Sequence, residues 1–153
     1  DTIIRIGTCG AYTTDLKLFD LLNVENSASE STYAKYAWGI EGELIPHQGN
    51  AFEVINETAS SLSINAKATN IHTSDIFYRK DAGIPAVAEK YNCLAVEMEA
   101  FALFANAKYL GKNAATILTV SDVIPTHEQI SADERERALK PMIELALESA
   151  IKL

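Results

Sequence analysis

The sequence has few of the features that mark membrane proteins, disulfide-rich proteins or nucleic-acid-binding proteins. No apolar run reaches the roughly 18 residues that a membrane-spanning helix needs, and the first residues lack the basic-then-apolar order of a signal peptide. Two cysteines, Cys9 and Cys93, are too few for a disulfide framework or a metal cluster. Acidic residues outnumber basic ones by 21 to 13, and the net charge of −8 argues against nucleic acid or an anionic membrane as a partner. A small anion held by one or two local arginines stays compatible with this charge.

The rest of the composition is that of an ordinary globular domain. With 153 residues, of which 48% are hydrophobic and 22% charged, the chain is long enough to bury a sizeable core. We therefore expect a single domain over residues 1–153, located in the cytoplasm. The sequence begins with Asp rather than Met, and a β-branched run, TIIRI, follows at once, so we also expect a fragment or a processed chain.

Apolar periodicity predicts alternating strands and helices. Short apolar or β-branched runs bounded by turn-forming residues predict strands near 2–7, 20–26, 67–73, 93–98 and 114–121. Helical patterns lie near 50–64, 83–91, 99–110 and 131–151, the last with Ser131 as N-cap and Glu134 three residues on. Residues 27–49 have no clear period and predict a long excursion or a pair of loops. The alternation indicates a largely parallel α/β sheet covered on both faces.

In open α/β sheets, ligands bind outside the carboxyl ends of the strands, so the residues that follow each strand are the first candidates for a site. The first such junction is IIRIGTCGA, residues 3–11. Arg5 lies in the strand pattern, and residues 7–10 predict a turn whose N–H groups and Thr8 hydroxyl hold an oxyanion, for instance phosphate. The plain alternative is a tight glycine turn with no ligand.

The second junction is HTSDIFY, residues 72–78. Phe77 and Tyr78, adjacent at the end of a strand, form a flat wall suited to a heteroaromatic ring, or else simply pack against a neighbouring element. His72 in the strand is interpreted as a structural histidine with satisfied hydrogen bonds.

The third junction, AVEMEAFALF, residues 95–104, places two carboxylates in an apolar run. In a strand over 93–98, Glu97 shares a face with Cys93 and Ala95, and Glu99 falls where the helix begins. A carboxylate there is favoured by the helix dipole and can accept paired hydrogen bonds from a vicinal diol such as ribose. The alternatives are an ordinary first-turn carboxylate for Glu99 and an ion pair for Glu97.

The fourth junction is ILTVSDVIPTHEQ, residues 117–129. Asp122 at the strand end is a candidate general acid if a desolvated pocket raises its pKa, with an arginine of the following helix able to reset its charge. The plain alternative is a loop Asp that starts a turn. His127 is expected on an exposed loop.

Taken together, in this order and spacing, the motifs RIGTCGA, SDIFY, VEMEAFALF, TVSD and HEQISADERER resemble the hexameric, bacterial-type purine nucleoside phosphorylases of the nucleoside phosphorylase family. They extend from residue 5 to residue 137, and VEMEA followed about twenty residues later by TVSD is the most specific pair. The resemblance implies a phosphorylase/hydrolase-like α/β fold, with a central mixed, largely parallel sheet flanked by helices and incomplete at the N-terminus.

The resemblance also implies roles for individual residues. The phosphate-contacting residues would be Arg5 and Thr8. The nucleoside-binding residues would be Phe77, which stacks on the purine, with Tyr78, Val96, Glu97, Met98, Glu99 and Ser121. Glu97 corresponds to the base-side carboxylate and Glu99 to the carboxylate that holds the ribose hydroxyls. The catalytic residues would be Asp122, which donates a proton toward N7 of the purine, and Arg135, which swings toward that Asp.

The activity implied is reversible phosphorolysis of purine nucleosides or deoxynucleosides, with inorganic phosphate as co-substrate, no metal or organic cofactor, and a homo-oligomer, by resemblance a hexamer. The family's N-terminal third, which carries a glycine-rich phosphate loop and residues lent to a neighbouring subunit, is not located in the sequence, so we expect little activity from this chain alone. Two alternatives stay open: a purine nucleosidase that uses water, and an inactive oligomerisation or binding fragment. A dinucleotide-binding domain is disfavoured because no G-x-G-x-x-G opens a helix after the first strand.

Overall fold

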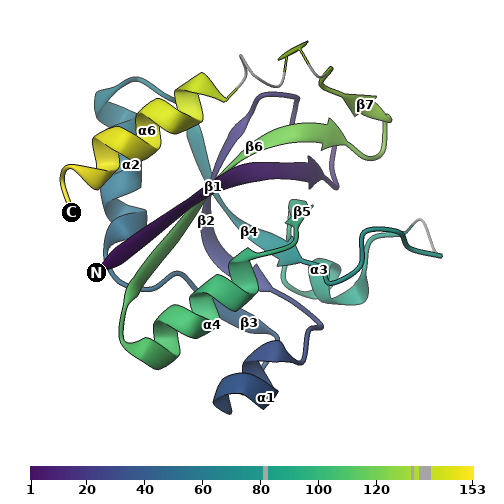
Figure 1. Ribbon diagram of the computed structural model, residues 1–153. Coiled ribbons are helices and arrows are strands. Elements are labelled where there is room, and N and C mark those ends of the chain that lie inside the picture. The colour runs from purple at the N-terminus through teal and green to yellow at the C-terminus, as the bar shows by residue number, and fades with distance from the viewer. Residues whose placement is uncertain (81–82, 132, 135–138) are drawn as a thin grey trace.

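A central mixed β-sheet organises the chain. The computed structural model describes residues 1–80, 83–131, 133–134 and 139–153 (Figure 1). The strands are β1 (Thr2–Ala11), β2 (Leu21–Ala28), β3 (Leu44–Pro46), β4 (Ala66–Thr73), β5 (Ala95–Glu97), β6 (Asn113–Val123) and β7 (Glu128–Gln129). The helices are α1 (Tyr33–Trp38), α2 (Ala51–Ser61), α3 (Ala86–Lys90), α4 (Ala100–Leu110) and α6 (Lys140–Ala150). None of the helices in the described ranges is long and apolar enough to cross a membrane.

The seven strands pair in the order β3-β2-β4-β5-β1-β6-β7, and β2 also pairs with β6. The pairs β1–β6, β2–β4 and β4–β5 are parallel, whereas β1–β5, β2–β3, β2–β6 and β6–β7 are antiparallel. The mixed sheet flanked by helices is therefore confirmed, and its two longest pairings, β1–β6 and β2–β4, are parallel. The extra β2–β6 pairing closes β2, β4, β5, β1 and β6 into a ring, and register shifts at Cys9/Gly10 and Val24/Asn26 supply local bends of the kind that such closure needs.

The long strand β6 carries the core on both of its faces. Leu118 and Val120 belong to the apolar cluster that includes Phe101 and Phe104 of α4, whereas Ala115 and Ile117 belong to the cluster with α2 and α6. Because strand side chains alternate between faces, a strand buried on both sides reads as a continuous apolar run. Figure 1 shows α4 on one side of β6 and α2 with α6 on the other.

The turn predicted at residues 7–10 is wrong. These residues continue β1 to Ala11 and pair with β6, Gly7 opposite Leu118 and Thr8 opposite Thr119. The parallel partner supplies the backbone hydrogen bonds that a turn would otherwise have to replace, so the glycine signal did not end the strand. Residues 7–10 therefore do not form the anion-binding turn of free N–H groups that the sequence predicted.

The segment 27–49 is more ordered than the predicted pair of loops. It contains the end of β2, helix α1 and strand β3, which pairs with β2. Trp38 of α1 stacks on Tyr109 of α4 at a ring-centroid distance of 4.1 Å, and its indole N–H donates to Asn106 over 2.6 Å. This contact between distant parts of the chain orders the segment, and no local period could have signalled it.

Helix boundaries differ from the predictions at several ends. The helix predicted at 83–91 covers only Ala86–Lys90, with Pro85 in extended conformation at its N-cap. The helix predicted over 131–151 is described as α6, Lys140–Ala150, while residues 132 and 135–138 lie outside the described residues. The predicted capping box is present, because the Glu134 N–H donates to the Ser131 hydroxyl oxygen over 3.2 Å and the Ser131 N–H donates to the Glu134 carboxylate over 2.9 Å.

Candidate functional site

A cavity of about 720 Å³ lies against β1, between the ends of β4, β5 and β6. It gathers residues from all four predicted junctions. The predicted site residues that line it are Arg5, Thr8, Phe77, Val96, Glu97, Met98, Glu99, Ser121 and Asp122. Tyr78 does not line it, and Arg135 lies outside the described residues.

The Arg5 guanidinium lies over Gly7, two residues further along β1. A Cβ atom at Gly7 would come within 2.8 Å of Arg5 Nη1, so the glycine supplies the space that the guanidinium occupies. Nη2 is 3.3 Å from Oε2 of Glu97 and donates to Oε2 of Glu99. Nη1 is buried and, among the residues that the structure describes, has no hydrogen-bond partner. A guanidinium that lines a cavity, is 19% exposed and has one unmatched donor is a candidate contact for an anionic ligand.

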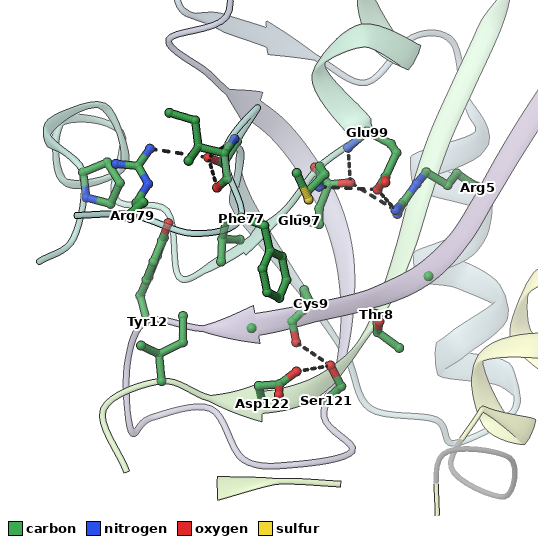
Figure 2. Close-up of a pocket in the computed structure, with 18 of the residues that line it drawn as sticks. Arg5, Thr8, Cys9, Tyr12, Phe77, Arg79, Glu97, Glu99, Ser121 and Asp122 are labelled. Carbon is green, nitrogen blue, oxygen red and sulfur yellow. Dashed lines mark hydrogen bonds and ion pairs between the residues drawn. The ribbon is translucent and has the colours of Figure 1, made fainter. Parts of the chain in front are cut away.

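Glu97 is locked inside the protein. Its side chain is 1% exposed, and its carboxylate accepts hydrogen bonds from the Thr73 hydroxyl, from the Glu99 N–H at 3.0 Å and from the Ala100 N–H at 3.0 and 3.1 Å. Burial raises the pKa of this carboxyl, and the Arg5 guanidinium and these hydrogen bonds act in the opposite direction. Glu97 therefore caps the first turn of α4 and pairs with Arg5, and both of its oxygens are engaged within the protein (Figure 2).

Glu99 faces the cavity from the N-cap position of α4. Its side chain is 57% exposed and makes no capping hydrogen bond to the helix. One oxygen, Oε2, accepts from Arg5 and from the Met98 N–H at 3.3 Å. The two carboxylates of the AVEMEAFALF stretch thus have different environments, one enclosed and one available at the cavity wall.

Ser121 and Asp122 form the floor at the end of β6. The Ser121 hydroxyl lies 2.5 Å from Oδ2 of Asp122 and 3.3 Å from the carbonyl oxygen of Cys9. Asp122 also belongs to the hairpin formed by β6 and β7, since it pairs with Gln129. Burial raises the pKa of the neighbouring Cys9 thiol, which keeps that thiol protonated and unsuited to act as a nucleophile.

Phe77 and Tyr78 lie on the segment that follows β4. Both rings are largely exposed, 76% and 88%, and they meet edge to face with centroids 5.0 Å apart. The Phe77 ring projects into the cavity, between Arg5 and Glu99 on one side and Tyr12 and Arg79 on the other (Figure 2). An aromatic ring exposed to this extent has a face available for stacking with a flat ligand.

Several residues of the site were not predicted. Tyr12 and Arg79 line the cavity, and both connect to the buried His72 region. The Tyr12 hydroxyl lies 2.7 Å from Nδ1 of His72, and Nε2 of His72 lies 2.6 Å from the Glu30 carboxylate, which also accepts from Arg79. The prediction that His72 is buried with satisfied nitrogens is confirmed, as is the exposed turn at His127. Glu30 and Tyr12 are 42 and 60 residues from His72, so no local motif announces their contacts.

These observations define a class of site: a small-molecule cavity in an α/β protein, with a guanidinium at one end, a partly exposed carboxylate beside it and an aromatic wall. Within the described part of the chain, no group of three or more His, Cys, Asp or Glu residues is placed to hold a metal ion.

The sequence matches the profile of the phosphorylase superfamily over residues 1–151, and the chain belongs to this family. It is 42% identical over 156 aligned residues to the DeoD-type purine nucleoside phosphorylase of Mycoplasma genitalium, covering 100% of this chain and 65% of that protein. It is 35% identical to the DeoD-type purine nucleoside phosphorylase of Geobacillus stearothermophilus, covering 99% of this chain and 64% of that protein. The chain thus spans about two thirds of the length of these relatives, and the family resemblance read from the motifs is confirmed.

Among solved structures, the chain is similar to the 5'-methylthioadenosine/S-adenosyl homocysteine nucleosidase of Campylobacter jejuni. The TM-score is 0.82 at 23% sequence identity, with 98% of this chain and 69% of that chain covered. This likeness shows a shared fold.

Proposed function

We propose that the chain forms the main part of a purine nucleoside phosphorylase site, which reversibly converts a purine ribonucleoside or deoxyribonucleoside and phosphate into the free base and the pentose 1-phosphate. The observation that carries this proposal is the cavity-lining Arg5, whose Nη1 has no partner among the described residues, beside the carboxylate of Glu99 and the exposed ring of Phe77. The identity of 35–42% to DeoD-type phosphorylases supports the same reaction.

In this proposal each part of the ligand has its own contacts. Phosphate binds Arg5 and the Thr8 hydroxyl, since a guanidinium presents several donors to a phosphate. The ribose hydroxyls donate to the Glu99 carboxylate, and the purine stacks on Phe77. Val96 and Met98 form apolar walls around base and sugar, and Tyr78 supports Phe77 edge-on.

Glu97 acts on the nucleoside through its neighbours. Its carboxylate holds the Arg5 guanidinium and the backbone N–H of Glu99, so it fixes the phosphate-binding and ribose-binding groups relative to each other. Substrate binding then requires an exchange of partners: phosphate replaces Glu99 on Arg5, and the ribose hydroxyls replace Arg5 on Glu99.

The chemistry is a displacement at C1′ of the sugar. The C1′–N9 bond breaks while a phosphate oxygen bonds to C1′, so positive charge develops on the ribose and negative charge on the departing purine. Asp122, hydrogen-bonded to Ser121, donates its proton toward N7 and neutralises the leaving group, and Arg135 promotes this transfer. A positioned acid of this kind contributes on the order of 10²–10⁴ in rate.

The proposed reaction needs inorganic phosphate and no organic cofactor or metal. We place it in the cytoplasm, where both free thiols, Cys9 and Cys93, would stay reduced. We also propose a homo-oligomer, a hexamer by resemblance to the family, which sedimentation velocity would test; a chain that stays monomeric would refute that part.

The test is an assay of the purified chain with inosine or adenosine, with and without phosphate, together with equilibrium dialysis of the nucleoside. Phosphate-dependent release of base with formation of ribose 1-phosphate supports the proposal. Free ribose formed without phosphate would instead establish a nucleosidase. A chain that neither binds nor turns over any purine nucleoside would refute both the phosphorylase and the nucleosidase. The binding-fragment alternative would then remain.

A further inference from the structure

A chain of hydrogen bonds lies at the end of the cavity opposite Arg5. It runs from the Tyr12 hydroxyl to Nδ1 of His72 at 2.7 Å, from Nε2 of His72 to the Glu30 carboxylate at 2.6 Å, and from Glu30 to the Arg79 guanidinium. Figure 2 shows Tyr12 and Arg79 on the far side of the Phe77 ring from Arg5 and Glu99. The four residues come from four separate segments, and the proposed phosphorolysis uses none of them.

The direction of each hydrogen bond follows from what each group can donate. An ionised carboxylate only accepts, so Nε2 of His72 carries the hydrogen that reaches Glu30. In a neutral imidazole the other nitrogen is then an acceptor, so the Tyr12 O–H donates to Nδ1. His72 is fully buried, and the Arg79 cation already balances the Glu30 carboxylate, so a neutral imidazole leaves the cluster without net charge.

The protonation states of Glu30 and Tyr12, the two hydrogen-bond partners of His72, agree with this assignment. Burial favours the neutral form of Glu30, but hydrogen bonds from His72, from its own backbone and from Arg79 outweigh it and lower the pKa of Glu30 below its usual value. Burial raises the pKa of Tyr12 to about 12, which keeps the phenol protonated. Because its only hydrogen is given to His72, the Tyr12 oxygen has only lone pairs left for a ligand.

We propose that Tyr12 is a specificity-determining residue that accepts a hydrogen bond from an exocyclic amino group on the ligand, and that His72 and Glu30 are positioning residues that set the direction of this bond. The inference rests on the proposed function, because that places phosphate at Arg5, the sugar at Glu99 and the base on Phe77. The base edge remote from the sugar then points toward Tyr12, and in a purine this edge carries the substituent on C6.

A 6-amino group can donate to the Tyr12 oxygen. An oxygen substituent on C6 would instead place its lone pairs against those of the Tyr12 oxygen, which is unfavourable. Of the donors of the nearby Arg79, Nη2 donates to Glu30 and, at 3.4 Å, to the Ser74 hydroxyl. A single hydrogen bond of this kind contributes about 1.4 kcal/mol, which corresponds to about a tenfold change in affinity.

The test compares binding of adenine and 6-methoxypurine by isothermal titration calorimetry. Both bases have an unprotonated N1, and they differ in whether C6 carries a donor or an acceptor. For each protein we take the ratio of its affinity for adenine to its affinity for 6-methoxypurine. The steric effect of the methyl group is common to all variants, so the informative quantity is this ratio in a variant divided by the ratio in the wild type. In Tyr12→Phe we expect this relative ratio to fall about tenfold.

Glu30→Gln gives a prediction that a merely structural role would not give. Arg79 only donates, so it selects the amide oxygen of the new Gln, and the amide NH₂ then donates to Nε2 of His72. The other ring nitrogen becomes N–H and donates to the Tyr12 oxygen, which frees the Tyr12 O–H to donate into the cavity. The relative affinity ratio of adenine to 6-methoxypurine should therefore fall further in Glu30→Gln than in Tyr12→Phe.

Glu43→Gln is the matched control, since Glu43 pairs with Lys90 on the surface and does not line the cavity. Its ratio should equal that of the wild type, and thermal unfolding of every variant shows whether it is folded. If Tyr12→Phe does not fold, the change in the affinity ratio in Glu30→Gln tests the inference by itself. Wild-type ratios in both folded variants would overturn this inference only, whereas a wild-type chain that binds no purine base would overturn the proposed function and this inference with it.

Discussion

Nη2 of Arg5 lies 3.3 Å from Oε2 of Glu97, and the same nitrogen donates to Glu99, so one guanidinium joins two carboxylates of very different exposure. The Glu97 side chain is 1% exposed and the Glu99 side chain 57%. Glu97 is surrounded by donors of the protein, whereas Glu99 can change partner without unfolding anything. This division predicts that the same substitution costs much more stability at Glu97 than at Glu99.

Glu97→Gln should destabilise the fold. The amide removes the charge that pairs with Arg5 and turns an acceptor into a donor facing the Thr73 hydroxyl or the first N–H groups of α4. We expect a loss of about 2–4 kcal/mol in the free energy of unfolding, because a buried partner is left unpaired. Urea unfolding followed by circular dichroism measures it. Glu99→Gln is the control, expected to cost less than about 1 kcal/mol; equal losses would contradict the division.

Glu99→Gln should separate the two ligands of the proposed site. Removing the carboxylate frees Arg5 of one competitor, so the affinity for inorganic phosphate alone should rise about three- to tenfold. The affinity for a nucleoside should fall about tenfold, because an amide accepts less strongly from the ribose hydroxyls. Calorimetric titration with each ligand tests both statements. A lower phosphate affinity would mean that Glu99 holds Arg5 in its binding position.

Gly7→Ala should weaken phosphate binding through Arg5. The new methyl group would lie within 2.8 Å of Nη1, and the guanidinium, as the end of a flexible side chain, must move away from it. We expect about a tenfold loss in phosphate affinity with less than about 1 kcal/mol lost in stability. In the background of Arg5→Met the same substitution should have no further effect on phosphate affinity. A loss that persists without Arg5 would mean that the backbone of β1, and not the side chain, is disturbed.

The same residues show how far the sequence predicted the site. The placement of Glu97 in a strand and of Glu99 where the helix begins is confirmed, because both follow from local patterns along AVEMEAFALF. Gly7 was misinterpreted as part of a turn, since the sequence does not say that β6 pairs with β1 beyond it. Ring closure by β2 and β6 and the contacts of His72 depend on segments far apart in sequence, for which no local pattern exists.

The Glu30 carboxylate should make stability depend on pH in a defined direction. Its pKa is lowered in the folded state, so it contributes stability above its unfolded value of 4.5, and this contribution is lost as the pH falls through the lowered folded value. The difference in melting temperature between the wild type and Glu30→Gln should be constant near neutral pH and shrink below pH 4.5. Because Glu30 is half exposed, we expect about 1 kcal/mol or less at the plateau. A difference that grows toward low pH would have the wrong sign.

Asp122→Asn should distinguish substrates by how much their leaving group needs a proton. Asparagine cannot donate a proton to N7, so kcat/KM for adenosine should fall by about 10²–10⁴. A nucleoside already methylated at N7 leaves as a neutral base, so its kcat/KM should change less than about threefold in the same variant. The control is Glu128→Gln, an exposed carboxylate on the neighbouring strand β7, which should affect neither substrate. If adenosine and the N7-methylated nucleoside lose activity equally, Asp122 maintains the shape of the floor with Ser121 and is not the acid. If only adenosine is affected, the proton that Asp122 supplies is what limits departure of the purine.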